Sequence, residues 1–267
     1  MRDLANDFKD ESEALYELIA PLKEARLFVP TRFKDWTIDD VIGHLHLWNV
    51  AADLSYEDEA GFAALMDELL PQIMAGESHV AVTRRWLDGL KGKALIEAWR
   101  DFYLPMVERF AEADPKQRVK WAGPDMSVRS SLTARLMETW AHGQAVYDLL
   151  GVERVNTDRI KNIAVLGVNT YGWTFKNRKM TPPGEPPYVK LTAPSGAVWE
   201  WNEQDAENCV TGSAEEFCQV VTQCRALGDT DLQIAGEAAS QWMEKAQCFA
   251  GPPETPPEPG HRRQNAG

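Results

Sequence analysis

Hydrophobic stretches long enough to cross a membrane are missing from this 267-residue sequence. A membrane-spanning helix needs about 20 consecutive apolar residues, and no run in the chain approaches that length. The first residues, MRDLANDFKDESEALYELI, also lack the apolar segment and cleavage site of a secretory signal peptide. We therefore expect a cytoplasmic protein without a membrane partner.

Basic residues are scarce relative to acidic ones. The chain has 28 Lys and Arg against 41 Asp and Glu, which gives a net charge of −13. Such a surface repels a phosphate backbone, and no stripe of basic side chains offsets it, so we expect no nucleic-acid partner. A small anionic substrate is not excluded, because one arginine in a pocket can locally outweigh the global field.

Cysteine is also sparse, and its spacing excludes one kind of metal site. The four cysteines lie in the last quarter of the chain, at Cys209, Cys218, Cys224 and Cys248. They form no CxxC pair, which argues against a zinc ribbon. No nearby His or Asn pattern indicates a catalytic thiol, so we interpret them as reduced, mostly buried side chains.

Helical periodicity fills the first two-thirds of the sequence and predicts a mainly α fold. The predicted helices cover residues 4–25, 37–52, 58–74, 80–90, 93–113, 127–150 and 158–175. Thr37 followed by Asp40 has the spacing of a capping box, with Trp36 before it as a hydrophobic staple. We expect these helices to form one domain over residues 1–179.

The composition and the periodicity of the sequence change after residue 179. Four prolines between residues 180 and 187 are incompatible with regular structure and predict a linker. Short strand-like runs and two further helical patterns follow, which predict a small α+β domain over residues 188–250. The segment 251–267 is rich in Pro, Gly and charge, and we expect it to be disordered.

A carboxylate and an imidazole share one face of the predicted helix 127–150. Glu138 and His142 are four residues apart and therefore lie one turn apart on a helix that is apolar nearly all round. A buried carboxylate is costly unless it is paired or bound to a metal. The pair therefore suggests a metal site, although the same spacing is also found in surface pairs and in satisfied core pairs.

A third ligand comes from the segment Asp40-Val-Ile-Gly-His-Leu-His. His44 lies on the apolar stripe of its helix with Val41 and Trp48, whereas His46 lies about 200 degrees further round. His44, Glu138 and His142 would then form a three-residue site with an open position, as in catalytic zinc centres. Nitrogen and oxygen ligands suit zinc, and they also suit nickel, iron or manganese.

Two motifs resemble a known family. The segments Trp36-Thr-Ile-Asp-Asp-Val-Ile-Gly-His44-Leu and Glu138-Thr-Trp-Ala-His142-Gly resemble the DinB-like and mycothiol-dependent maleylpyruvate isomerase N-terminal family. The resemblance covers residues 1–175. It implies a DinB-like four-helix bundle with extra helices, in which these three residues hold a divalent metal. The segments at 210–225 and 235–242 resemble the small domain appended to such proteins.

The resemblance also implies a class of function. It suggests a metal- and thiol-dependent isomerase or S-transferase that uses mycothiol or glutathione and acts on a small-molecule substrate. Arg225 would match the arginine with which the second domain anchors the substrate, although an arginine at a helix C-terminus also interacts favourably with the helix dipole. The alternative is a non-enzymatic, metal-stabilised module that binds a small molecule or a partner. We expect a monomer or a homodimer.

Overall fold

The structure, a computed structural model, describes residues 1–262 and divides them into two compact units, which meet in the sequence at Leu149 and Leu150. Each unit is described by itself. The fold is mainly α with a small α+β part, as the sequence predicted. Within the described residues, no helix is both long and apolar enough to cross a membrane.

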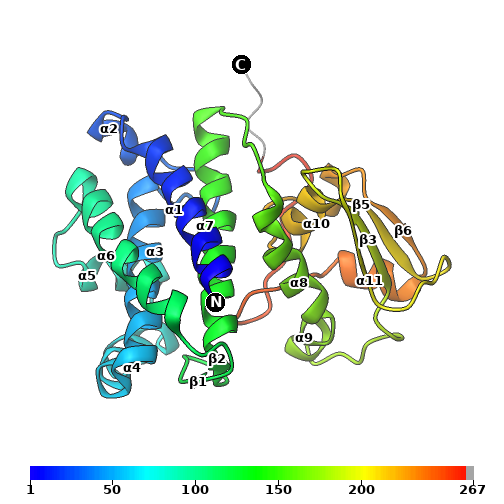
Figure 1. The fold of residues 1–267 in the computed structure, drawn as a ribbon. Helices are drawn as coiled ribbons and strands as arrows, with labels where there is room; N and C mark the ends of the chain where they lie inside the picture. Colours follow the sequence, from blue (N-terminus) through cyan, green and yellow to red (C-terminus); the bar gives the residue numbers. More distant parts are fainter. Residues whose placement is uncertain (263–267) are drawn as a thin grey trace. The chain divides into compact units, whose positions relative to one another are not determined.

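The first unit is helical (Figure 1). Its helices are α1 (Arg2–Ile19), α2 (Glu24–Leu27), α3 (Ile38–Glu57), α4 (Glu59–Met74), α5 (His79–Trp86), α6 (Gly92–Glu112) and α7 (Val128–Leu150). A short antiparallel hairpin of β1 (Arg118–Val119) and β2 (Met126–Ser127) precedes α7.

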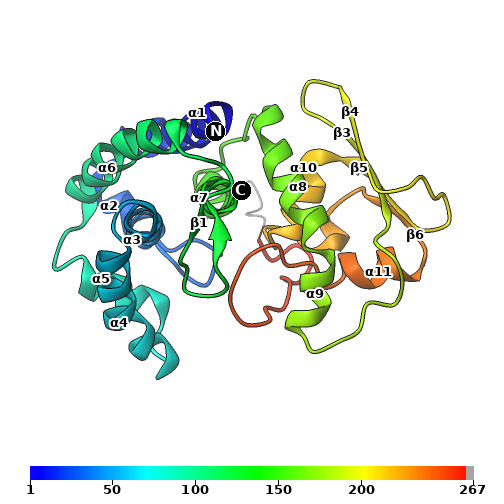
Figure 2. The same cartoon turned by 60° about the horizontal axis from the view of Figure 1, so that its bottom comes forward.

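The core of this unit forms where α6 packs against both α1 and α3 (Figure 2). Phe8 of α1 meets the edge of Tyr103 of α6, and Trp99 lies beside Tyr103; all three are fully buried. Large aromatic side chains contribute most of the hydrophobic stabilisation in such a core. The packing holds α3, one of the two helices that carry the candidate site, against a rigid neighbour.

The second unit combines short helices with a four-stranded sheet. The helices are η1 (Asp158–Ile160), α8 (Lys161–Asn169), α9 (Tyr171–Asn177), α10 (Ala214–Val221), η2 (Leu227–Asp229) and α11 (Glu237–Met243). The strands are β3 (Tyr188–Thr192), β4 (Val198–Trp201), β5 (Cys209–Ser213) and β6 (Gln233–Ala235), in the order β4-β3-β5-β6. Strands β3 and β5 are parallel, and the two outer pairs are antiparallel.

The boundary between the units differs from the expected one. We expected the first domain to extend to residue 179, but α8 and α9 belong with the second unit. The reason is packing: α8 lies against α10, and α9 lies against α11. A Cβ on Gly167 would stand 2.9 Å from both Phe217 and Val221, so α8 and α10 approach each other closely.

The segment after residue 250 is partly fixed by hydrogen bonds. The Glu254 backbone N–H donates to the Gln247 side chain at 2.9 Å, and the Gly260 backbone N–H donates to Asp229 at 2.8 Å. Both bonds involve the segment 251–267 that we expected to be disordered, and that expectation stays a prediction. The remainder of that prediction, residues 263–267, lies outside the described residues.

Candidate metal centre

Helix α3 is fixed at its start by a capping box, as the sequence predicted. The Asp40 N–H donates to the Thr37 hydroxyl at 3.1 Å, and the Thr37 N–H donates back to the Asp40 carboxylate at 3.0 Å. The buried Asp40 carboxylate also accepts from Arg84 of α5 at 2.7 Å. These bonds set the first turn of α3, and His44 follows one turn later.

Helix α7 presents the other two residues. The Ser130 N–H donates to the Ser127 hydroxyl at 3.1 Å, at the position where the sequence predicted this helix to begin. Glu138 and His142 follow in the middle of α7, four residues apart. That spacing places both side chains on the same face, one turn apart.

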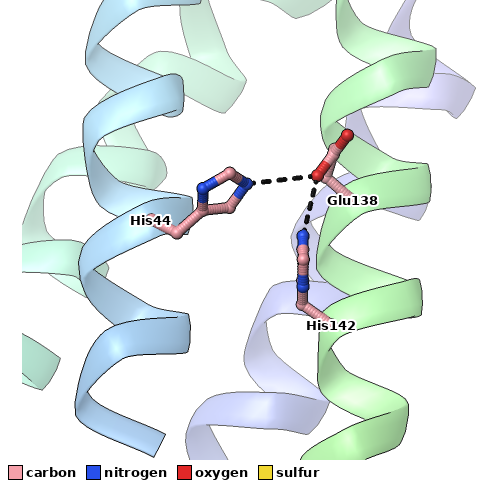
Figure 3. Close-up of side chains that lie close together, drawn as sticks. All are labelled: His44, Glu138 and His142. Carbon is pink, nitrogen blue, oxygen red and sulfur yellow. Dashed lines mark hydrogen bonds and ion pairs between the residues drawn. The ribbon is translucent and has the colours of Figure 1, made fainter. Parts of the chain in front are cut away.

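The three predicted residues converge on one point (Figure 3). The Nε2 atom of His44 lies 3.3 Å from Oε2 of Glu138, and the Nε2 atom of His142 lies 3.0 Å from the same oxygen. One ligand atom from each residue falls within 4.8 Å of the other two. All three side chains are largely buried, with 12–19% of their surface exposed.

Burial and charge set the protonation of the site at neutral pH. Burial lowers the pKa of His44 to about 4, so its ring is uncharged. Burial alone would raise the pKa of Glu138, but hydrogen bonds with His142 and His44 outweigh it and hold that pKa well below its usual range. An ionised carboxylate beside a neutral imidazole is the protonation state that metal binding requires.

The spacing of the donor atoms fits a metal ion. Bonds of about 2.0–2.1 Å in tetrahedral geometry separate neighbouring donors by about 3.3 Å. The two His-to-Glu separations, 3.3 and 3.0 Å, agree with that value. Nδ1 of His44 is buried and has no hydrogen-bond partner within residues 1–262, so Nε2 carries the ring's polar contact.

Aromatic rings enclose the two histidines, and the sequence did not reveal this. Trp36 stacks on His142 with a centroid separation of 5.4 Å and an interplanar angle of 7°, and it tilts against His44 at 5.2 Å. Phe33 meets the edge of His142 at 5.1 Å. From the sequence we assigned Trp36 only a role as a hydrophobic staple at the start of α3. Its position directly before the capping box was the one sequence feature that could have indicated its place beside His44.

The other histidines of the first unit are placed differently. His46 faces away from the site, as its helical angle predicted, and packs against Trp86 and Phe102. The exposed His79, at the start of α5, has its ring 6.5 Å from that of His44. The edge of the site therefore carries a third imidazole that spacing did not identify.

Arg225, the predicted substrate anchor, lies in the second unit. It is buried, with 6% of its surface exposed, and its Nη1 donates to the Cys224 carbonyl at 3.0 Å. Three of the four cysteines are buried as expected, and Cys209 is half-buried. Burial raises the pKa of the Cys218 and Cys224 thiols, which disfavours their reactive thiolate form.

Comparisons with known proteins point to one family. The profile described as the mycothiol maleylpyruvate isomerase N-terminal domain matches residues 8–147. Two uncharacterized proteins of Mycobacterium tuberculosis, from strains CDC 1551 / Oshkosh and ATCC 25618 / H37Rv, are each 43% identical over 247 residues, covering 92% of this chain and 95% of theirs.

The solved structures agree on the fold. The crystal structure of mycothiol-dependent maleylpyruvate isomerase aligns with a TM-score of 0.50 and 16% identity, over 82% of this chain and 87% of that one. A mutant of the same isomerase aligns with the same TM-score and coverage at 15% identity. At this level of identity the likeness establishes a shared architecture and leaves the chemistry to be argued from the residues.

Proposed function

Because this chain belongs to the mycothiol maleylpyruvate isomerase N-terminal domain family, we propose that it is a metal-binding, thiol-dependent isomerase or S-transferase. The observation that carries the proposal is the convergence of His44, Glu138 and His142 on one point, with donor atoms spaced as around a single ion. Three protein ligands leave a coordination position for a small molecule, which is the pattern of catalytic rather than structural zinc sites.

Zinc is the proposed metal, with nickel, iron or manganese as alternatives that the same donors would accept. A divalent ion held there supplies Lewis acidity, which lowers the pKa of a coordinated thiol and provides a thiolate nucleophile at neutral pH. The chain's own contribution is to keep His44 uncharged and Glu138 ionised, and to hold the ring of His142 in place under Trp36.

The proposed cofactor is a low-molecular-weight thiol, mycothiol or glutathione. Mycothiol is named in the description of the matching family and in that of the solved isomerase. The buried cysteines support an external thiol, because burial raises the pKa of both Cys218 and Cys224. An external thiol reaching the open coordination position needs no nucleophile from the protein.

Arg225 remains the proposed anchor for a substrate carboxylate in the second unit. This part of the proposal rests on the sequence resemblance of residues 210–225. An arginine binds a carboxylate through two parallel hydrogen bonds, which suits it to anchor such a substrate. Arg225→Lys, which keeps the charge and loses the planar fork, should raise KM for a carboxylate substrate with little change in kcat.

The direct test is turnover of maleylpyruvate by zinc-loaded protein with mycothiol or glutathione. His44→Ala should abolish activity, since it removes one of three ligands. His46→Leu is the matched control, because that histidine lies on the same helix and packs against Trp86 and Phe102 instead. Equal activity in wild type and His44→Ala would overturn the proposal, and bound metal without turnover of any thiol acceptor would favour the non-enzymatic module.

A further inference from the structure

A second charged side chain, Arg135, precedes Glu138 on α7, and two of its guanidinium nitrogens have no hydrogen-bond partner within residues 1–262. Arg135 is 5% exposed, and within residues 1–262 its Nε and Nη1 atoms make no hydrogen bond. A buried cation is costly unless it is paired. Arginines in this position are normally satisfied by carboxylates or carbonyl oxygens, so the free donors of Arg135 require a reason.

The position of Arg135 on α7 supplies that reason. Residues three and four apart share a helix face, so Ser131, Arg135, Glu138 and His142 form one stripe along α7. Ser131 is also buried, and its hydroxyl makes no hydrogen bond to any described residue. Two side chains with donors that make no hydrogen bond within residues 1–262, Ser131 and Arg135, therefore precede Glu138 and His142 on the same face.

Aromatic rings connect the guanidinium to the other side of the site. The Arg135 guanidinium carbon lies 5.3 Å from the centre of the Trp121 ring. The ring centroids of Trp121 and Trp48 are 5.6 Å apart, and those of Trp48 and His44 are 6.3 Å apart. A ligand seated against these tryptophans would have its anionic end near the guanidinium.

The charge balance favours an anion. Glu138 and Arg135 carry opposite charges and lie three residues apart on the same face of α7, so their charges offset each other in the metal-free protein. Imidazoles that bind a metal are neutral, so a divalent ion would leave the site with two positive charges in excess. One thiolate and one carboxylate would neutralise them, and Nε and Nη1 of Arg135, which have no hydrogen-bond partner within residues 1–262, can donate to the carboxylate.

We propose that Arg135 is a binding residue for a carboxylate group of the molecule that occupies the metal centre. The inference rests on the proposed function for the metal, and it adds that the ligands of this enzyme are carboxylic acids bound beside α7. The carboxylate can belong to the thiol or to the acceptor substrate, and the guanidinium binds either in the same way. Ser131, one turn earlier, is placed to donate a second hydrogen bond.

The test uses cobalt-substituted full-length protein, in which a thiolate ligand gives a visible charge-transfer band. One arm titrates 3-mercaptopropionate against 3-mercapto-1-propanol, which differ in the carboxylate alone. A second arm adds propionate or 1-propanol to protein already carrying 3-mercapto-1-propanol. We expect the carboxylate probe to bind about 10-fold more tightly in at least one arm, as one charge-assisted hydrogen bond would produce.

Arg135→Met should abolish that preference and leave the affinity for 3-mercapto-1-propanol unchanged. Arg135→Lys should retain part of it and serves as the second variant if the methionine variant fails to fold. Arg129→Met is the matched control, because it removes one arginine from an exposed position of the same helix. The proposal is overturned if neither arm shows a preference for the carboxylate, or if Arg135→Met keeps it.

A metal-free arm separates this proposal from the proposed function. The Nε–H signal of Arg135 in a nitrogen-correlated NMR spectrum is assigned by its loss in Arg135→Met. Propionate should shift that signal in apo wild type even if no cobalt binds. If the charge-transfer band is missing but propionate shifts the Arg135 signal, the metal function alone is contradicted. If the signal does not move at saturating propionate and the cobalt protein shows no preference for the carboxylate probe, the role of Arg135 is contradicted.

Discussion

Trp36 stacks face to face on His142, with ring centroids 5.4 Å apart and planes 7° from parallel. The same indole touches His44, so one side chain restrains the two imidazoles of the proposed metal centre. Groups that orient metal ligands without binding the metal affect its affinity nearly as strongly as the ligands themselves. The loop before α3 is thereby part of the site.

We predict that Trp36→Leu weakens metal binding by about 10-fold, since mutation of groups that orient ligands typically costs 10–100-fold. The half-exposed indole supports the orientation of His142 more than the core, so the melting temperature of the apo protein should change little. Competition with a metal chelator measures the affinity. Trp36→Phe keeps a ring over the histidines and should stay close to wild type; an equal loss in both variants would contradict the stacking argument.

The capping box of α3 should contribute measurably to stability. Thr37→Ala removes the hydroxyl that accepts from the Asp40 N–H, and loss of such a cap costs about 1 kcal/mol. Urea unfolding followed by circular dichroism gives the free energy of unfolding. Thr37→Ser retains the hydroxyl and should recover most of the difference, and the prediction is wrong if serine and alanine variants are equally destabilised.

Glu13 should make the first unit less stable in acid. Hydrogen bonds from Arg100 lower the pKa of Glu13 and outweigh its partial burial, and Tyr103 adds a further hydrogen bond at 2.6 Å. A carboxylate whose folded pKa is depressed stabilises the protein above its unfolded pKa, about 4.3, and loses that contribution as pH falls through the folded value. Thermal unfolding between pH 7 and 3 should therefore show a smaller acid-induced loss in Glu13→Gln than in wild type.

The assignment of α8 to the second unit leads to a separate prediction. Gly167→Val would push a side chain into Phe217 and Val221, and overpacking of this kind costs about 1–3 kcal/mol. The damage should fall on the second unit and leave the metal content unchanged. Gly172→Ala is the control, since a Cβ there meets nothing within 4 Å. Loss of metal from Gly167→Val would contradict the assignment of α8 to the second unit.

Local rules sufficed for the parts of this fold that depend on neighbours in sequence. The Thr37 cap, the one-turn spacing of Glu138 and His142, and the opposite directions of His44 and His46 follow from helix geometry alone, and the structure agrees with each of them. The mainly α class follows from the same periodicity.

Features that arise from long-range packing were not predictable in this way. Trp36 stacks on His142 across two elements far apart in the sequence, and the positive φ values of Lys34 and Asp35 just before it are not indicated by any pattern in the sequence. The place of α8 depends on α10, more than forty residues later in the chain. The two guanidinium nitrogens of Arg135 that lack a hydrogen-bond partner within residues 1–262 could likewise be identified only from the structure.

The central claim is that His44, Glu138 and His142 bind one metal ion, and elemental analysis after zinc loading and desalting tests it most directly. We predict about one zinc per chain in wild type and in His46→Leu, and almost none in His44→Ala, Glu138→Gln and His142→Ala, each with a circular dichroism spectrum like that of wild type. Wild-type protein that retains no metal, or ligand variants that retain as much as His46→Leu, would contradict the account.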